Sequence, residues 1–352
     1  MTRHLLALAL MAASAMAAST PAADAAKAPE ITFRAFGSWG LLSQYKDYER
    51  PFWTDTVPAL TGGRVAVDIT PFDQAGLKGS EMVRLLNLGS VDIGTTVLSY
   101  ISDQDPIVEG VDLSGMAQDA ASARRIADAF APAMARHFEQ KYGIRMLALW
   151  PYPAQMLMCK APIAGLDDLK GKKVRVSLRT NSDLLESLGA VTLSIPFNEV
   201  YAKIRDGAVD CLVTGTLSAN AAKLYEVTHY LYNLPMGWST IMLGMTQASW
   251  NRLAPRDQAA LAQGIATLAD TMWHVADVQT AQGLACNAGQ DSCRLGQKGA
   301  MKLVAASARD RERIDRIVPE VVVKRWFERC GAACASQWSE SVGRLPRIGA
   351  AK

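Results

Sequence analysis

Residues that carry catalytic chemistry are scarce in this chain of 352 residues. It has only four histidines, which are scattered along the chain, and it has no Gly-x-Ser-x-Gly nucleophile elbow and no phosphate-binding loop. Basic and acidic residues nearly balance, 37 against 34, and aromatic residues are not interleaved with lysine or arginine. The composition therefore gives little support to a hydrolase, and we expect no nucleic-acid partner.

Long apolar runs are also missing, except at the N-terminus. A short basic start precedes an apolar run from Leu5 to Met16, and small-residue cleavage patterns follow it. The run is about a dozen residues, well short of the roughly 20 that span a bilayer, and the pattern is typical of a secretory signal peptide. We therefore predict a signal peptide at residues 1–26, export to the periplasm and no stable membrane insertion.

The remaining chain is long enough for about two domains of roughly 150 residues each. Residues 31–37 predict a strand, a helical stretch follows, and Val65, Val67 and Ile69 alternate as in a second strand. Strands that alternate with helices in this way are typical of an α/β fold with a mainly parallel sheet.

Two segments of the chain resemble each other. Residues 81–92 (EMVRLLNLGSVD) and 199–210 (EVYAKIRDGAVD) share Glu, Gly, Val and Asp at the same spacing, and each continues into a strand-like run. The glycine suits the end of a helix, and the aspartate suits a turn into a strand. The pattern predicts one helix–glycine–strand unit in each of two similar lobes, although chance similarity is the alternative because such units are common.

The longest predicted helix runs from Pro255 to Gln282. Proline suits a first helical turn, and apolar residues recur at helical spacing after it. A helix of about 27 residues is roughly 40 Å long, which is enough to cross from one lobe to the other.

The six cysteines fall into two groups. Four lie in the last fifth of the chain: Cys286, Cys293, Cys330 and Cys334. In an oxidising compartment these four are disulfide candidates with three possible pairings, whereas a zinc site is disfavoured by their spacing and the lack of a nearby histidine. Cys159 and Cys211 lie in strand-like apolar runs, so we predict two buried small residues without a bond.

The stretch from Asp168 to Gly207 carries a resemblance to a known family. In order, it contains DLKGKKVRV, LGA, PFNEVY and the start of GAVD. These motifs resemble the signature region of TRAP transporter solute-binding proteins, the P-subunit family of periplasmic organic-acid receptors. The similarity continues through the Trp250 segment and the long helix and covers essentially the whole mature chain, while the C-terminal cysteine-containing segment resembles one subgroup.

The resemblance implies a two-lobed, periplasmic-binding-protein-like clamshell with a long helix spanning both lobes. We expect lobe I at 27–151 plus about 239–276. Lobe II is expected at 152–238 plus about 277–345, including the cysteine-containing segment. The implied partners are a small organic carboxylate and the membrane permease subunits of a TRAP transporter, with no catalysis and no cofactor.

Arg175 is the candidate anchor for the ligand, because the family's arginine at this strand position grips the ligand carboxylate. A planar guanidinium can make two parallel charge-assisted bonds to a carboxylate, and an ion pair within one lobe is the alternative. Gln155 and Thr214 stand where many sialic-acid and C4-dicarboxylate receptors have a second arginine and an asparagine. Gln155 and Tyr100 instead resemble the 2-oxo-acid receptors of the family.

Those 2-oxo-acid receptors bind a metal through acidic residues that this chain lacks, so no metal is expected. Aromatic residues near the predicted cleft suggest an apolar wall, although each could be ordinary core. We therefore predict a small monocarboxylate ligand, aromatic, apolar or 2-oxo. The predicted ligand-binding residues are Trp39, Tyr100, Gln155, Arg175, Asn181, Phe197, Thr214 and Trp238. A ligand-binding partner of a membrane sensor and a secreted enzyme on the same fold are the alternatives.

Overall fold

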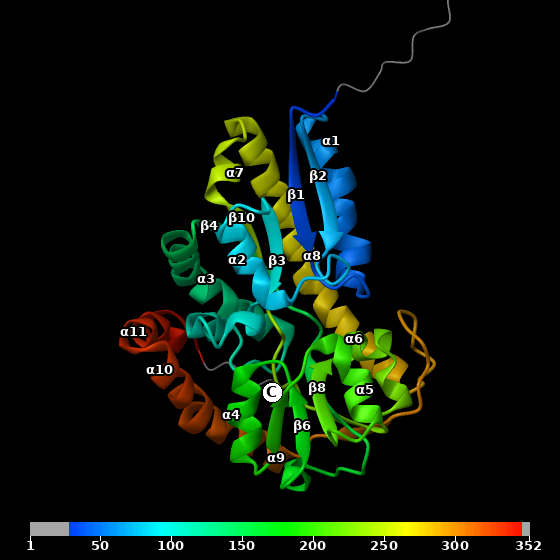
Figure 1. Cartoon of the computed structure of the whole chain (residues 1–352). Coiled ribbons are helices and arrows are strands. Elements are labelled where there is room, and N and C mark those ends of the chain that lie inside the picture. Colours follow the sequence, from blue (N-terminus) through cyan, green and yellow to red (C-terminus); the bar gives the residue numbers. More distant parts are fainter. Residues whose placement is uncertain (1–27, 347–352) are drawn as a thin grey trace, which may run out of the picture.

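The computed structural model describes residues 28–346, which form two lobes, each built around one mixed sheet (Figure 1). The first sheet has the order β2-β1-β3-β10-β4 and the second β11-β9-β5-β8-β6-β7. The strands of the first sheet are β1 (Ile31–Gly37), β2 (Val65–Pro71), β3 (Ile93–Val97), β4 (Ile144–Trp150) and β10 (Ile241–Thr246). Those of the second are β5 (Gln155–Cys159), β6 (Lys173–Val176), β7 (Val191–Ser194), β8 (Cys211–Gly215), β9 (Tyr230–Asn233) and β11 (Lys302–Ala305). The predicted two-lobed α/β architecture is confirmed.

Each sheet contains one strand that runs against the others. β10 is antiparallel to β3 and β4, and β5 is antiparallel to β8 and β9, while the remaining pairs are parallel. These are the two strands that the chain enters directly after crossing from the other lobe. They begin at the boundary between the lobes, where strands such as β1, β6 and β8 end, and so their direction is reversed.

Helices, most of them short, cover the two sheets. In the first lobe they are η1 (Gln44–Glu49), η2 (Phe52–Thr56), α1 (Val57–Thr61), η3 (Gly79–Glu81), α2 (Met82–Asn87), η4 (Leu98–Ile101), η5 (Pro106–Val111), α3 (Ala120–Tyr142) and α7 (Gln247–Asn251). Around the second sheet they are η6 (Leu166–Leu169), α4 (Arg179–Ser187), η7 (Phe197–Glu199), α5 (Val200–Arg205), α6 (Thr216–Ala221), η8 (Leu224–Glu226), α9 (Ala308–Ile317) and η9 (Val318–Val323). The C-terminal helices are α10 (Lys324–Cys330), α11 (Ala332–Ser341) and η10 (Val342–Arg344).

The repeated helix–glycine–strand unit is confirmed in both sheets. Gly89, after α2, has φ of 64°, and Gly207, after α5, has φ of 77°, a left-handed conformation that favours glycine. In each copy the following aspartate, Asp92 or Asp210, accepts a hydrogen bond of 2.8 Å from the main-chain N–H of a neighbouring strand. In each lobe, therefore, the glycine ends the helix and the aspartate fixes the next segment to a neighbouring strand.

The long helix α8 runs from Pro255 to Asn287, five residues beyond its predicted end. It packs against α1 and β4 in the first lobe and against α6 in the second, and Figure 1 shows it descending from one lobe into the other. At 33 residues it is about 50 Å long. The C-terminal helices then return to the first lobe, where the Trp326 and Trp338 indoles donate to the carbonyls of Pro106 and Gly110. The lobe boundaries given above stay a prediction.

The prediction for the two core cysteines is wrong, because Cys159 and Cys211 form a disulfide. They face each other directly in the antiparallel register of β5 and β8, with their Cα atoms 4.0 Å apart. That register brings the two sulfur atoms within bonding reach. The spacing of the two residues along the sequence does not predict this register.

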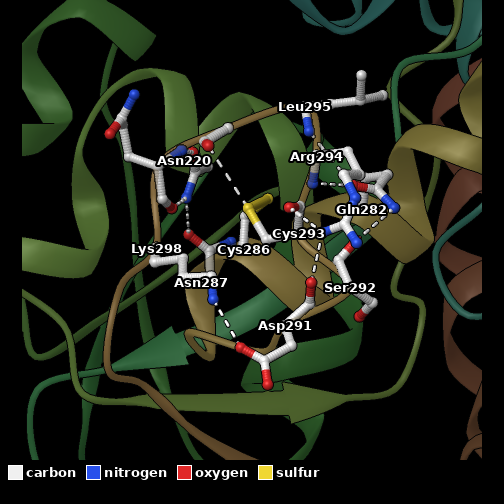
Figure 2. The surroundings of a disulfide bond; sticks show 12 residues. Asn220, Gln282, Cys286, Asn287, Asp291, Ser292, Cys293, Arg294, Leu295 and Lys298 are labelled. Carbon is white, nitrogen blue, oxygen red and sulfur yellow. Dashed lines mark hydrogen bonds and ion pairs between the residues drawn. A yellow bond between two sulfur atoms is a disulfide. The ribbon is translucent and has the colours of Figure 1, made fainter.

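The four C-terminal cysteines pair with their nearest neighbours, Cys286 with Cys293 and Cys330 with Cys334. The first bond closes the end of α8 onto a loop held by side chains of α6 and α8 (Figure 2). There Asn220 accepts from the Gln297 N–H at 2.8 Å, and Gln282 accepts from the Arg294 N–H at 2.7 Å. The disulfide prediction for these four residues is therefore confirmed, with its pairing now assigned.

Within residues 28–346, no helix has both the length and the apolar character needed to cross a membrane. The predicted signal peptide at residues 1–26 lies outside the described residues.

Candidate functional site

A cavity lies between the two lobes, where the parallel strands end. The space between its lining atoms, open solvent included, is about 310 Å³. It is lined by Trp39, Leu42, Tyr100, Tyr152, Gln155, Arg175, Ser177, Phe197, Thr214, Gly215, Ser218 and Ser239. Open α/β sheets bind ligands beyond the carboxyl ends of their strands, and this cavity has that position in both lobes.

The strand ends explain how these residues meet. Trp39 follows β1, Ser177 follows β6, and Gly215 is the last residue of β8, so each lies where a parallel strand reaches the boundary between the lobes. Gln155 is the first residue of β5, and Ser239 immediately precedes the return to the first sheet. The two mixed sheets face each other end to end and thus surround one space.

Six of the eight predicted ligand-binding residues line this cavity: Trp39, Tyr100, Gln155, Arg175, Phe197 and Thr214. The structure places the other two elsewhere. Trp238 is buried and donates its indole N–H to the carbonyl of Ala117 at 3.2 Å. The buried Asn181 amide donates to the Met236 carbonyl at 2.7 Å, so both residues fasten the segment that crosses back to the first lobe.

Arg175, on β6, is 1% exposed, and no carboxylate within the described part of the chain forms an ion pair with it. Its Nε donates to the carbonyl of Ile195 at 2.8 Å, and its Nη1 donates to the carbonyl of Val213 at 3.1 Å. Burial lowers the pKa of Arg175 to about 10, so the group is still protonated at neutral pH. Two main-chain carbonyls therefore orient a guanidinium whose charge is uncompensated, and an anion in the cavity would supply the missing partner.

Aromatic side chains form one wall of the cavity and meet across the two lobes. The Trp39 ring lies edge-on to Phe72 and to Phe197, with centroid distances of 4.7 and 5.5 Å, and Phe197 belongs to the second lobe. The Trp39 indole N–H donates to the Tyr100 hydroxyl at 3.1 Å. Burial raises the pKa of Tyr100, while the nearby Arg175 lowers it, so this hydroxyl stays neutral. The wall offers apolar area with one hydroxyl group at its edge.

Asp112 holds the segment that returns from the second lobe to the first. Its carboxylate accepts main-chain N–H bonds from Trp238 at 2.9 Å and Thr240 at 3.3 Å. Between them, Ser239 has φ of 50°, which is unusual for a residue with a side chain. Burial raises the pKa of Asp112 to about 6, and the main-chain N–H bonds oppose this rise. The strained Ser239 lines the cavity, so Asp112 shapes the site without touching it.

A metal site is not evident among residues 28–346, where no group of three or more His, Cys, Asp and Glu could hold an ion. The prediction that no metal binds stays a prediction.

The predicted set of ligand-binding residues leaves out half of the lining: Leu42, Tyr152, Ser177, Gly215, Ser218 and Ser239. Ser177 and Gly215 could have been found, because each lies at the end of a predicted strand. Tyr152 was recognisable only as a residue near the crossing. Leu42 and Ser218 lie on irregular or helical segments whose direction depends on how the lobes pack.

Comparisons with known proteins agree with the two-lobed fold. The family model for bacterial extracellular solute-binding protein, family 7, matches residues 43–314. The sialic acid-binding periplasmic protein SiaP of Vibrio cholerae is 24% identical over 236 residues, covering 65% of this chain and 71% of that protein.

Two solved structures illustrate the shared fold. DctP7 of Bordetella pertussis, an extracytoplasmic solute receptor binding pyroglutamic acid, superposes with a TM-score of 0.76 at 21% identity, covering 88% of this chain and 98% of that one. A marine metagenome TRAP solute binding protein specific for aromatic acid ligands has a TM-score of 0.75 at 18% identity, covering 89% and 99%.

Proposed function

Because the chain belongs to family 7 of the bacterial extracellular solute-binding proteins, we propose that it is the periplasmic receptor of a TRAP transporter and captures a small organic monocarboxylate with Arg175. Members of the family are receptors and not enzymes, which agrees with the lack of catalytic motifs in the sequence. The captured solute would be delivered to the membrane permease.

The observation that carries this proposal is the buried, unpaired guanidinium of Arg175. A buried charge without a partner is strongly unfavourable, and a carboxylate can accept two charge-assisted hydrogen bonds from one guanidinium. Since Nε and Nη1 already bond to main-chain carbonyls, the side chain cannot easily turn away from the cavity. The arrangement favours an anion at one defined place.

The rest of the lining favours a ligand with one carboxylate. Arg175 is the only cationic residue among those that line the described cavity, and no acidic residue lines it. The other polar groups are hydroxyls and one amide, next to the aromatic rings of Trp39 and Phe197. A neutral body with some apolar area would fit such a wall better than a second charged group.

Ligands of similar proteins support a small organic acid of this kind. The solved relatives include receptors that bind pyroglutamic acid, an aromatic acid and orotic acid. Others are described with bound malonate or succinate, which have two carboxylates. Dicarboxylates therefore belong in any ligand screen, as the class that the single arginine disfavours.

The test is ligand binding to the mature protein by thermal unfolding and calorimetry, with aromatic, lactam, 2-oxo and aliphatic monoacids and with dicarboxylates. A ligand at about 100 times its Kd stabilises the folded state by about 2.7 kcal/mol. Arg175→Ala is expected to weaken binding of the best monoacid at least about 30-fold, since removing one partner of a buried charge pair costs about 2–5 kcal/mol.

The matched control is Arg179→Ala, which removes an exposed guanidinium four positions later, at the start of α4. This variant should bind the monoacid as the unchanged protein does. Equal affinity of Arg175→Ala and the unchanged protein would refute the anchor, and a preference for dicarboxylates would refute the proposed ligand class.

A further inference from the structure

Three buried polar atoms beside the cavity have no hydrogen-bond partner within the described part of the chain: Ser38 Oγ, Glu49 Oε1 and the Tyr152 hydroxyl. Their residues are 1%, 0% and 4% exposed. Leaving a polar group buried and unpaired costs about 1–3 kcal/mol, and native proteins contain few such groups. Three of them in one place indicate that something else completes their bonding.

The three residues come from separate segments that converge in the first lobe. Ser38 follows β1, Glu49 ends η1, and Tyr152 lies in the crossing between β4 and β5. The Ser38 main-chain N–H donates to Glu49 Oε2 at 2.8 Å, which leaves Oε1 free. Tyr152 and Trp39, the residue that follows Ser38, line the same cavity. Burial raises the pKa of Tyr152, the Glu49 charge raises it further, and the Ser38 hydroxyl lowers it, which agrees with the three groups lying close together.

Tyr152 connects this cluster to the ligand. It is the one member of the three that lines the cavity, and it lies in the crossing segment, whereas Arg175 comes from β6 of the second lobe. A ligand held by its carboxylate at Arg175 would therefore present another part of its body to the Tyr152 hydroxyl.

We propose that Ser38, Glu49 and Tyr152 form a second polar subsite that binds an N–H or O–H group of the ligand. The preferred solute is then a small monocarboxylate that also carries a hydrogen-bond donor, such as a lactam or a hydroxylated aromatic acid. This inference rests on the proposed function, because it assumes that the carboxylate is held at Arg175.

The direction of the hydrogen bonds explains why the ligand group is a donor. An ionised carboxylate only accepts, so in the ligand-bound protein the Tyr152 hydroxyl would give its single hydrogen to Glu49 Oε1, which has no partner in the ligand-free structure. Its phenolic oxygen then has a lone pair left, and because Tyr152 lines the cavity, we expect this oxygen to accept from the ligand. A ligand with a methylene at that place would leave the oxygen unpaired and lose the bond.

Pairs of ligands that differ in one donor test this subsite. Pyroglutamate is compared with its cyclopentanone analogue, in which a methylene replaces the ring N–H, and metahydroxyphenylacetate is compared with phenylacetate. Calorimetry is done at pH 8, above the pKa of about 7 that burial gives Glu49, so that the carboxyl is ionised. In at least one pair the donor-bearing acid should bind about tenfold more tightly, or about 1.4 kcal/mol.

Tyr152→Phe should bring this ratio to about one by weakening the donor-bearing acid alone. Because the hydroxyl has no partner to lose, the melting temperature of the ligand-free variant should stay the same or rise. Ser38→Ala, which keeps the main-chain bond to Glu49, should reduce the ratio as well. The matched control is Tyr232→Phe, which removes a hydroxyl that donates to Asp310 at 2.7 Å in the second lobe. It should lower the melting temperature and leave the ratio unchanged.

The outcomes separate the two proposals. Equal binding within both pairs, or a ratio that Tyr152→Phe leaves unchanged, would overturn the subsite while Arg175 still anchors the acids. Tighter binding of the donor-free acids would overturn it too. If no acid in the wider carboxylate screen binds, the proposed function fails, and the subsite fails with it.

Discussion

At the residue scale, buried carboxyl groups determine how the ligand-free protein responds to pH. Glu49 is fully buried, and burial raises its pKa to about 7, while the Ser38 main-chain N–H bond and the neighbouring Ser38 and Thr95 hydroxyls oppose the rise. Asp112 behaves in the same way, with a pKa of about 6. Both groups hold their proton more tightly in the folded protein than in the unfolded chain.

The sign of the pH effect follows from linkage. The unfolded glutamate releases its proton near pH 4.5 and the folded one near pH 7, so folding stability falls as pH rises through this window. Between pH 5 and pH 8 the Glu49 contribution to the free energy of unfolding should decrease by about 2 kcal/mol. Glu49→Gln does not titrate, so urea unfolding of both proteins at the two pH values measures this loss.

The predicted quantity is the change, between pH 5 and pH 8, in the difference in unfolding free energy between the two proteins. Glu49→Gln should gain stability relative to the unchanged protein on going from pH 5 to pH 8. If the gap between the two proteins is the same at both pH values, the carboxyl does not titrate in this window.

At the scale of elements, the contact between α8 and α6 joins the long helix to the second lobe. Gly283 lies where α8 meets the start of α6, and a Cβ atom there would collide with the main chain of Thr216 and Leu217. A main chain cannot move aside as the end of a side chain can. The contact therefore requires glycine within the last turns of a helix, where its helix propensity is poor.

Gly283→Ala tests this contact, and Gly264→Ala in the same helix is its control. A Cβ at Gly264 would meet only side-chain atoms, the nearest being Leu60 Cδ1 at 2.6 Å. Alanine gains up to about 1 kcal/mol of helix propensity at either site, and overpacking costs about 1–3 kcal/mol. We expect Gly283→Ala to lower the free energy of unfolding by about 2 kcal/mol or more, and Gly264→Ala to lower it less.

Chemical unfolding of the two variants gives the answer. Equal stability of Gly283→Ala and Gly264→Ala would mean that α6 can move away from α8 without lowering the free energy of unfolding, which would contradict the prediction. Since α6 begins directly after cavity residue Gly215, Gly283→Ala should also weaken ligand binding, whereas Gly264→Ala should not.

At the scale of the whole molecule, the two crossing segments are bonded to each other between the lobes. The Tyr152 N–H donates to the Trp238 carbonyl at 2.9 Å, and the Gln155 N–H donates to the Gly237 carbonyl at 2.8 Å. In return, the Met236 N–H donates to the Gln155 carbonyl at 2.8 Å. These bonds give the lobes a short, two-stranded connection next to the cavity, the kind of link around which two lobes can close.

Ligand binding should therefore close the lobes. Trp39 and Arg175 line one cavity from different lobes, so a ligand that touches both stabilises the closed arrangement by its differential affinity. Small-angle X-ray scattering should show a radius of gyration near 20 Å for a compact chain of this length, and a smaller value in the bound state than in the free state.

Arg175→Ala should keep the value of the free state when the same ligand concentration is added. An unchanged radius in a sample that calorimetry shows to be saturated would contradict closure.

What the sequence by itself determined is local. Alternating apolar residues, glycines at helix ends and the long apolar stripe of α8 act over a few residues, so they predicted the strands, the repeated unit and the spanning helix. The family resemblance of the strand motif around Arg175 likewise marked the one cation among the residues that line the described cavity, and the cost of burying a lone arginine agrees with that assignment.

What only the tertiary structure decided depends on register and on convergence of distant segments. The bond between Cys159 and Cys211 follows from the pairing of β5 with β8. Trp238 lies with the crossing segment instead of in the cavity because its indole N–H is bonded to Ala117. Ser38, Glu49 and Tyr152 converge through three chain segments far apart in sequence. Such closeness depends on how whole elements pack, and no spacing along the chain encodes it.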